Sequence, residues 1–254
     1  MKFLSVILLG GLSFSAFSAF SASSALAADI PARVDISYSI TSGSLEGEVN
    51  DTLEIKRESG SRSYLISSES RAKGLLALTQ PDPVIRDSEG TITTHGSMRP
   101  SRFSDQHGKN LPKVAIFDWG KKLLTLQYKG KEEQRALPAD AQDKLSLPYS
   151  FIFSPVSGKV INLHETDGKR LEMVHYAVSK ETLDTPMGKL ETIVLTRQKE
   201  NDGERDKKIW LAVDHHMLPV RIVAAEKMGI VTDQMVTKIN YGESLSGLKQ
   251  GRLH

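Results

Sequence analysis

The segment from Lys180 to Glu226 limits the fold most, because turns too short for a crossover separate its apolar, strand-forming runs. The first turn, residues 184–188, contains a proline, which holds φ at about −65°, and two residues later a glycine that tolerates positive φ. The second turn, residues 214–217, joins the run 209–213 directly to the run 218–223. Such short connections allow only an antiparallel return. The segment therefore predicts a β-meander.

Alternation of apolar and polar residues extends this prediction to the N-terminal half. Residues 34–40 and 45–56 place apolar side chains at one parity and polar side chains at the other, as in a strand with one buried face. Residues 171–178 and 209–213 are apolar at both parities, so both of their faces should be covered. Further strand runs are expected at 64–66, 85–94, 100–106, 114–119, 123–128, 160–163, 189–197 and 231–241, with glycine at many of the bends.

Two short stretches favour helix. Residues 72–78 predict a helical turn or an apolar corner. Between 137 and 153, Asp140 is a capping residue, and Leu145 and Tyr149 have the i, i+4 spacing of one helix face, with Pro148 as a kink. The predicted fold class is therefore all-β, with one or two short helices. We expect a curved antiparallel meander or half-barrel wrapped around a short helix.

The N-terminus has the pattern of a secretory signal peptide. A lysine is followed by an apolar, serine-rich run and by Ala25-Leu26-Ala27. We expect cleavage after residue 27, a single antiparallel β domain over 28–242, a polar tail over 243–254, and no membrane span in the mature chain. The sequence contains no cysteine, which excludes disulfides and a thiol-linked lipid. The expected location is the periplasm.

Charge argues against nucleic acid as a partner. The formal net charge is +2, and loss of the signal peptide, with one lysine and no carboxylate, leaves +1. Nucleic-acid-binding proteins concentrate Lys and Arg on one face. Here both signs are interspersed, as in 129–133 and 200–208, which we interpret as solvated hairpin tips.

No motif supports catalysis. Residues 242–247 have the wrong spacing for a hydrolase elbow, and Ser70-Arg71-Ala72-Lys73 lacks the partner motifs of a serine acyltransferase site. The prediction is a protein that is not an enzyme and has no cofactor. A pair of carboxylates for glycoside chemistry is left open, because the fold sets their separation.

Metal binding has one candidate, the turn Asp214-His215-His216, with His164, Glu165 and His175 on other predicted strands. Adjacent residues of one tight turn rarely converge on one ion, and no His-Glu-x-x-His or cysteine cluster is present. We therefore expect exposed turn histidines and no metal.

The aromatic residues have two possible roles. Aromatic side chains in strands usually belong to the core. The alternative is a hollow under the helix that accepts an apolar ligand. Its expected lining residues are Phe117, Trp119, Leu145, Tyr149, Phe151 and Trp210. Trp210 is expected to be buried on the helix side of its strand.

Several motifs resemble those of a known family. They are Ser-Arg-Ala-Lys-Gly-Leu (70–75), Phe-Asp-Trp (117–119), the Leu-Pro and Asp-x-x-Ser-like segments of 137–149, Glu-Thr-Leu-Asp-Thr-Pro-x-Gly (181–188), and Trp-Leu-Ala-x-Asp with Leu-Pro-Val-Arg-Ile (210–222). The chain resembles the bacterial periplasmic domain-of-unknown-function family numbered 3108. The resemblance implies an exported β-rich protein without established chemistry. It also implies an architecture similar to the half-barrel carriers of outer-membrane lipoproteins.

Two functions follow as expectations. The first is a periplasmic binding or carrier protein whose apolar hollow holds a lipid or a lipoprotein acyl group. The alternative is a non-catalytic structural or assembly factor that binds another envelope protein through a sheet edge or the hairpin tip from Lys199 to Lys208. An open hollow beneath residues 140–153 favours the carrier, and a filled one favours the assembly factor.

Overall fold

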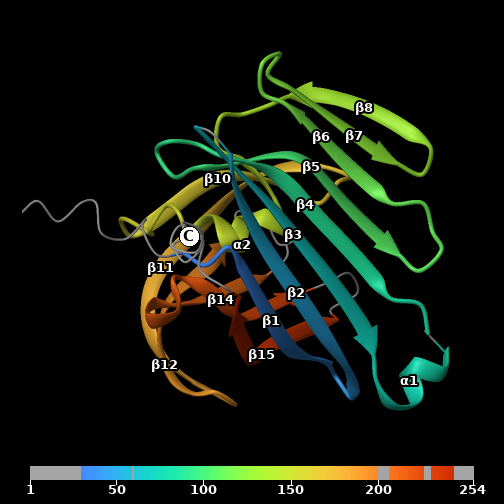
Figure 1. Cartoon of the computed structure of the whole chain (residues 1–254). Coiled ribbons are helices and arrows are strands. Elements are labelled where there is room, and N and C mark those ends of the chain that lie inside the picture. Colours follow the sequence, from blue (N-terminus) through green and yellow to red (C-terminus); the bar gives the residue numbers. More distant parts are fainter. Residues whose placement is uncertain (1–29, 59, 80, 200–205, 226–229, 243–254) are drawn as a thin grey trace, which may run out of the picture.

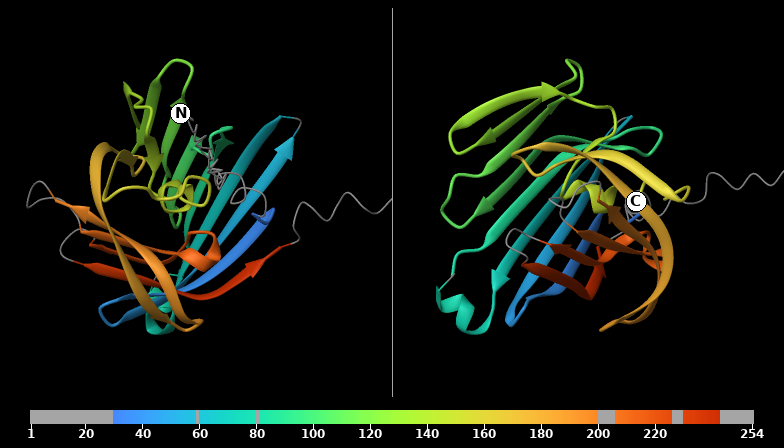
Figure 2. Two further views of the ribbon diagram at one scale, coloured as in Figure 1. Left: turned by 90° about the vertical axis from the view of Figure 1, so that its left-hand side faces the viewer. Right: turned by 180° about the vertical axis from the view of Figure 1, so that it is seen from behind.

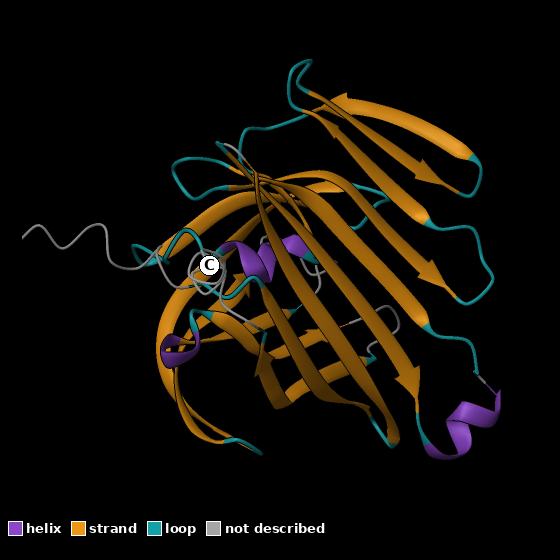
Figure 3. Cartoon of the chain, viewed as in Figure 1, coloured by secondary structure: helices purple, strands orange, loops and turns teal. Residues whose placement is uncertain are grey.

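The computed structural model describes residues 30–58, 60–79, 81–199, 206–225 and 230–242. These residues form one sheet of fifteen strands, joined by hairpin turns and accompanied by short helices (Figure 3). Within this part of the chain, no helix is long and apolar enough to cross a membrane. The residues expected to form the signal peptide, the C-terminal tail and most of the 199–208 tip lie outside it.

The N-terminal half of the chain builds one half of the sheet. Its elements are β1 (Arg33–Ser42), β2 (Leu45–Glu58), β3 (Ser61–Ala72), α1 (Gly74–Thr79), β4 (Val84–Ile92), β5 (Met98–His107), β6 (Lys113–Asp118), β7 (Leu123–Tyr128) and β8 (Lys131–Ala136). Strands β1 to β8 lie side by side in chain order, each antiparallel to the next.

The C-terminal half builds the rest. Its elements are β9 (Ala141–Asp143), α2 (Ser146–Ser150), β10 (Val160–Thr166), β11 (Leu171–Thr185), β12 (Gly188–Gln198), β13 (Lys207–Ala212), the 3-10 turn η1 (Val213–His215), β14 (Leu218–Ala225) and β15 (Val231–Tyr241). The only parallel pair among these strands is β9 with β10. The first strand, β1, pairs with the last, β15, and this pair joins the two halves (Figure 1).

The sheet curls until its two ends approach each other. The edge strands are β8 and β9, yet β9 also contacts β5, where the Gln142 side-chain amide donates to the Met98 carbonyl at 2.8 Å. Strands β6 to β8 extend beyond this contact (Figure 2). The result is a barrel-like sheet in which a side-chain hydrogen bond, and not a backbone ladder, connects β9 to β5.

Helix α2 lies inside the curled sheet and packs on both halves of it (Figure 2). Leu145 and Tyr149 belong to the larger apolar cluster, which includes residues of β1 to β7. Leu147 and Phe151 belong to a second cluster, formed with residues of β10 to β13. The prediction of a curved antiparallel sheet around a short helix is confirmed.

The start of this helix differs from the prediction. Residues 141–143, expected in its first turn, form strand β9, and the carboxylate that bonds to the backbone at the start of the helix belongs to Asp143 in place of Asp140. Its Oδ1 accepts hydrogen bonds from the backbone N–H groups of Leu145 at 2.9 Å and Ser146 at 2.7 Å. Pro148 lies in the first turn, where a missing N–H removes no helical hydrogen bond. The helix therefore starts later than expected and does not need a kink.

Strand β8 is an element that the pattern did not predict. Its sequence KEEQRA was expected in part as a solvated hairpin tip, and all six residues are exposed. Because it pairs with β7 through backbone hydrogen bonds, it needs no apolar face of its own. Charged side chains on an edge strand also oppose pairing with another chain.

Trp210 is buried as predicted, with 4% of its surface exposed. Its cross-strand neighbours Arg221 and Met235 place it on the face that continues to Ser39 of β1, opposite to the Tyr38 face that meets α2. Ile209 and Leu211, which flank it on β13 and point to the opposite face, share a cluster with Leu147 and Phe151. The far part of the β11–β12 hairpin extends beyond β13, and β11 contacts β15. Its residues Leu183, Met187 and Leu190 belong to the cluster that contains Trp210. The curled end of the β11–β12 hairpin therefore covers the Trp210 face of β13, which was expected to be covered by the helix.

Candidate functional site

Four of the six expected lining residues lie in one packed region. Phe117 stacks on Trp119 with ring centroids 6.2 Å apart, and both belong to or pack on the cluster that contains Leu145 and Tyr149. The Trp119 indole N–H donates to the Pro100 carbonyl at 2.6 Å, and Arg99 lies over its ring. These side chains are held by neighbours on several strands.

The remaining two lie in different clusters: Trp210 shares the larger cluster to which the first four belong or on which they pack, and Phe151 does not. Phe151 is buried in the second cluster. Trp210 has the cations of Lys208 and Arg221 over its ring, at 5.2 and 4.9 Å from the centroid. Its indole N–H has no hydrogen-bond partner among the described residues. Five of the six residues therefore belong to or pack on one cluster, and Phe151 lies in the other.

A buried polar layer lies where α2 meets the N-terminal strands. The Tyr149 hydroxyl donates to Asp51 Oδ2 at 2.6 Å and lies 3.4 Å from the Tyr38 hydroxyl, which donates to the Pro219 carbonyl at 2.8 Å. Burial raises the pKa of the Asp51 carboxyl, although hydrogen bonds from Ser68 and Tyr149 oppose this shift. The layer connects α2 to β1, β2 and β14.

We expect Tyr149→Phe to lower the free energy of unfolding by about 1–3 kcal/mol, because it removes the donor that lies 2.6 Å from the buried Asp51 carboxyl. Urea unfolding followed by circular dichroism measures the change. Tyr128→Phe is the matched control, since no hydroxyl hydrogen bond holds that half-buried ring among the described residues. Equal stability of the two variants would show that the Tyr149–Asp51 bond contributes nothing.

A second buried carboxylate anchors the segment between β9 and α2. Ser88 donates to Asp143 Oδ2 at 2.7 Å, and Ser146 donates to Gln142 Oε1 at 2.9 Å. Burial raises the pKa of Asp143, against the opposing hydrogen bonds from Ser88 and Ser146. These contacts hold the segment against β4 and position the residue that follows, Lys144.

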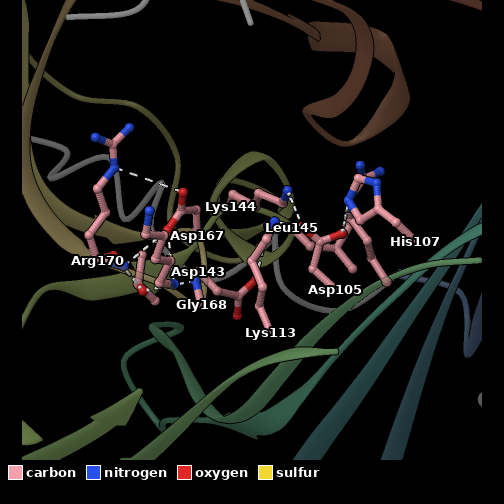
Figure 4. Close-up of polar contacts among 12 residues, drawn as sticks. Asp105, His107, Lys113, Asp143, Lys144, Leu145, Asp167, Gly168 and Arg170 are labelled. Carbon is pink, nitrogen blue, oxygen red and sulfur yellow. Dashed lines mark hydrogen bonds and ion pairs between the residues drawn. The ribbon is translucent and has the colours of Figure 1, made fainter. Parts of the chain in front are cut away.

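Lys144 reaches a dense cluster of charges on the inward face of β4, β5 and β6 (Figure 4). At its centre is Asp105, whose side chain is fully buried. Its Oδ1 accepts from Arg86 Nε at 3.0 Å and lies 3.1 Å from His107 Nε2. Its Oδ2 accepts from the ammonium groups of Lys113 at 2.7 Å and Lys144 at 2.8 Å. We call these five residues the Asp105 cluster.

The cluster shifts the pKa of two of its members. Burial alone would raise the pKa of Asp105, but the hydrogen bond with His107 and the charges of Lys144 and Arg86 outweigh it and hold that pKa well below its usual range. Burial and the charge of Arg86 lower the pKa of Lys144 to about 8, although Asp105 acts in the opposite direction. One carboxylate thus faces more positive charge than it neutralises.

A pocket of about 350 Å³ lies beside η1. It is bounded by the loop after α2, by the β11–β12 hairpin and by η1. Its lining residues are Pro155, Val156, Lys180, Glu191, Thr192, Ile193, Val213 and Met217. None of the six expected lining residues contributes to it.

The η1 turn has an uncommon backbone. His216 and Met217 have φ of 54° and 61°. This left-handed backbone conformation costs free energy in residues other than glycine. The Met217 N–H donates to the Ala212 carbonyl at 2.9 Å, and His215 Nδ1 lies 2.9 Å from the Tyr241 hydroxyl. The surrounding contacts thus hold the strained turn in place.

The histidines considered for a metal site are separated. His215 contacts Tyr241, while His164 Nδ1 lies 2.9 Å from Asp140 and His175 Nδ1 lies 2.8 Å from Asn162. Glu165 instead pairs with Lys207. In the part of the chain that the structure describes, no three His, Asp or Glu side chains are arranged to hold a metal ion.

A family model described as "Protein of unknown function (DUF3108)" matches residues 35–236. The chain belongs to this family. The match begins in β1 and ends in β15, so the DUF3108 domain spans the joined sheet from its first strand to its last. The resemblance inferred from the motifs is confirmed.

A solved structure supports the fold. The crystal structure of a beta-barrel-like protein of domain of unknown function DUF1849 from Brucella abortus is similar, with a TM-score of 0.53 and 9% sequence identity. The similarity covers 85% of this chain and all of the other. At this identity it bears on the fold alone. No curated protein matches the chain.

The sequence reasoning missed both the Asp105 cluster and the pocket. A signal for the cluster was present, because Arg86, Asp105 and Lys113 occupy inward positions of three consecutive strands. An ionisable residue at a core position of a strand is exceptional and needs a partner. The pocket has no such signal, since the curl of the β11–β12 hairpin brings its residues together.

Proposed function

We propose that this DUF3108 protein is a non-catalytic binding protein of the cell envelope that recognises a partner protein through the pocket beside η1. The observation that supports this proposal is that the apolar pocket beside η1 opens at the surface of the protein. In the interior, Leu147 and Tyr149 of α2 are almost completely buried by their neighbours, whereas the pocket is at the surface. This close packing around α2 favours recognition at the surface over enclosure of a lipid.

The chemistry of the pocket fits a side chain of another protein. Val156, Ile193 and Met217 give it an apolar lining, and its volume is at the low end of the range for ligand sites. Protein interfaces typically gain most of their binding energy from a few anchor residues inserted into such pockets. Lys180 and Glu191 add both signs of charge. A polypeptide can supply partners for both Lys180 and Glu191, whereas an anionic lipid head group can pair with Lys180 alone.

The strained turn supports a preformed site. Left-handed backbone at His216 and Met217 is retained against its energetic cost, and such strain is concentrated at functional sites. Val213, with 47% of its surface exposed, lies at the start of this turn. A rigid pocket wall lowers the entropy lost on binding.

A sheet edge is a poorer candidate for the same role. Edge strand β8 carries Lys131, Glu132, Glu133 and Arg135, which oppose the addition of a strand. At the other edge, Gln142 of β9 already bonds to β5. The pocket is therefore the surface that best suits a partner.

The proposal can be tested with a photo-crosslinking amino acid at position 213 of the full chain in its native cells. We expect one crosslinked protein of defined mass, which disappears when Val156→Asp places a charge in the pocket. The matched control is a crosslinker at Ile116, an exposed apolar residue on the distant strand β6. Because Val156 packs on the second apolar cluster, purified Val156→Asp should be somewhat less stable in urea than the parent but should remain folded under the crosslinking conditions.

Three results would contradict the proposal. They are no crosslinked protein at position 213, the same product at position 116, or a product that persists in Val156→Asp. Crosslinking to lipid alone at position 213, together with displacement of a fluorescent fatty acid, would instead support the carrier function.

A further inference from the structure

The Asp105 cluster has more cationic groups than its carboxylate needs. Arg86, Lys113 and Lys144 converge on one side chain, and His107 also contacts it. Since both ammonium groups donate to the same oxygen, Oδ2, they lie side by side. Asp105 carries one negative charge against two ammonium groups and a guanidinium, so it offsets the repulsion among these cations only in part.

Many donors of this cluster remain unused. Arg86 contacts Asp105 through Nε, so the outer edge of its guanidinium makes no hydrogen bond with another described residue. Each ammonium has three N–H donors and gives one to Asp105, with no second acceptor among the described side chains. The cluster therefore offers a guanidinium edge and two ammonium groups to a further acceptor.

The nearby acidic groups do not use these donors. Asp143 accepts from Ser88 and from the N–H groups at the start of α2. Asp167 accepts from the backbone N–H groups of Lys169 and Arg170 in the β10–β11 turn (Figure 4). Asp51 interacts electrostatically with Arg86, but the hydrogen bond that it accepts comes from the Tyr149 hydroxyl. The positive charge is thus not cancelled by a second carboxylate in contact.

Solvent reaches the cations but not the carboxylate. The side chains of Arg86, Lys113 and Lys144 are 25%, 24% and 27% exposed, whereas that of Asp105 is fully buried. A ligand approaching from solvent would therefore meet the cationic groups first. The buried carboxylate fixes their positions from behind, as a preorganised binding site requires.

We infer that the Asp105 cluster is a binding site for a phosphate group. A phosphate carries up to two negative charges and several acceptor oxygens, so it can bond to a guanidinium edge and two ammonium groups at once. A single carboxylate would leave positive charge unbalanced. The site lies on β4 to β6, apart from the pocket beside η1, and does not depend on the function proposed for that pocket.

Titration of the full chain with inorganic phosphate, followed by ³¹P NMR line width and by thermal unfolding, tests this site. Chloride at equal ionic strength is the reference. We expect saturable line broadening and a higher unfolding temperature with phosphate. Lys113→Met should lower the phosphate affinity by roughly ten- to a hundredfold, the loss of one charged hydrogen bond. Lys131→Met on the exposed strand β8 is the matched control and should leave the affinity unchanged.

If the parent protein causes no saturable broadening of the ³¹P line of phosphate, the inference is overturned without recourse to any variant. An unchanged affinity in a folded Lys113→Met protein would also overturn it. Lys113→Arg, which keeps the charge, should retain binding. Glycerol phosphate and vesicles containing phosphatidic acid distinguish two sources of the same chemistry. Binding of glycerol phosphate supports a soluble phosphorylated ligand, and binding of the vesicles alone, if lost in Lys113→Met, supports a lipid head group.

Discussion

Asp105→Asn should lower the free energy of unfolding by about 3–5 kcal/mol, the usual cost of removing one partner from a buried ion pair. The carboxylate is fully buried and is the shared acceptor of Arg86, Lys113 and Lys144. Without its charge these cations repel one another, and the contact that holds Lys144 and the adjacent β9 against β5 weakens. Urea unfolding at neutral pH measures the loss. Asp118→Asn, which removes an exposed carboxylate on β6, should change stability little.

The effect should depend on pH in one direction. Since the pKa of Asp105 is held well below its usual range in the folded protein, its contribution is present above the unfolded pKa of about 4 and is lost as the pH falls. The parent and Asp105→Asn should therefore differ most near neutral pH and converge in acid. A difference in stability that stays constant down to strongly acidic pH would contradict the role of the charge.

Trp210→Ala should cost about 3–5 kcal/mol, because it removes a large buried ring. The ring fills the space between β13 and the curled end of the β11–β12 hairpin, and the cations of Lys208 and Arg221 pack over it. A loss of this size is a large part of the stability of a single domain. We expect unfolding at much lower urea concentration.

A pair of conservative variants separates volume from hydrogen bonding. Trp210→Phe removes an indole N–H that has no partner among the described residues, so it should be milder than the alanine variant. Trp119→Phe removes the bond to the Pro100 carbonyl as well as volume. If Trp210→Ala is as stable as the parent but fails to bind a partner, the ring is a recognition residue and its assignment to the core is wrong.

Local patterns were sufficient to predict most strands. Alternation over 34–40 and 45–56 reflects a face that must be buried, and this requirement does not depend on which strand lies next to it. The turn at 184–188 also specifies a hairpin by its own chemistry, and the structure closes it between Thr185 and Gly188. Strand β8 was missed because an edge strand exposed on all sides needs no alternation.

Long-range packing determined what the sequence could not predict. The side on which Trp210 is buried depends on the curl of a hairpin whose residues 183–190 lie well upstream in the chain. The Asp105 cluster requires β9 to approach β5, a contact between segments that no spacing predicts. The pocket beside η1 likewise combines a loop, a hairpin and a turn. Periodicity reports which face of a strand is buried, but not what covers it.

The pairing of β1 with β15 has a consequence for how the chain acquires its structure. Every other neighbouring pair in the sheet joins strands that are consecutive in the chain, and all of these pairs except the parallel β9–β10 are antiparallel, so each half can form from local pairings as it is synthesised. The central ladder, by contrast, joins Val34 to Tyr241 and must wait for the last strand. Until then β1 presents an unpaired edge along its length, which is a template for aggregation. Circular permutation that connects β15 to β1 and opens the chain between β8 and β9 would make every antiparallel pair local, and refolding should accelerate.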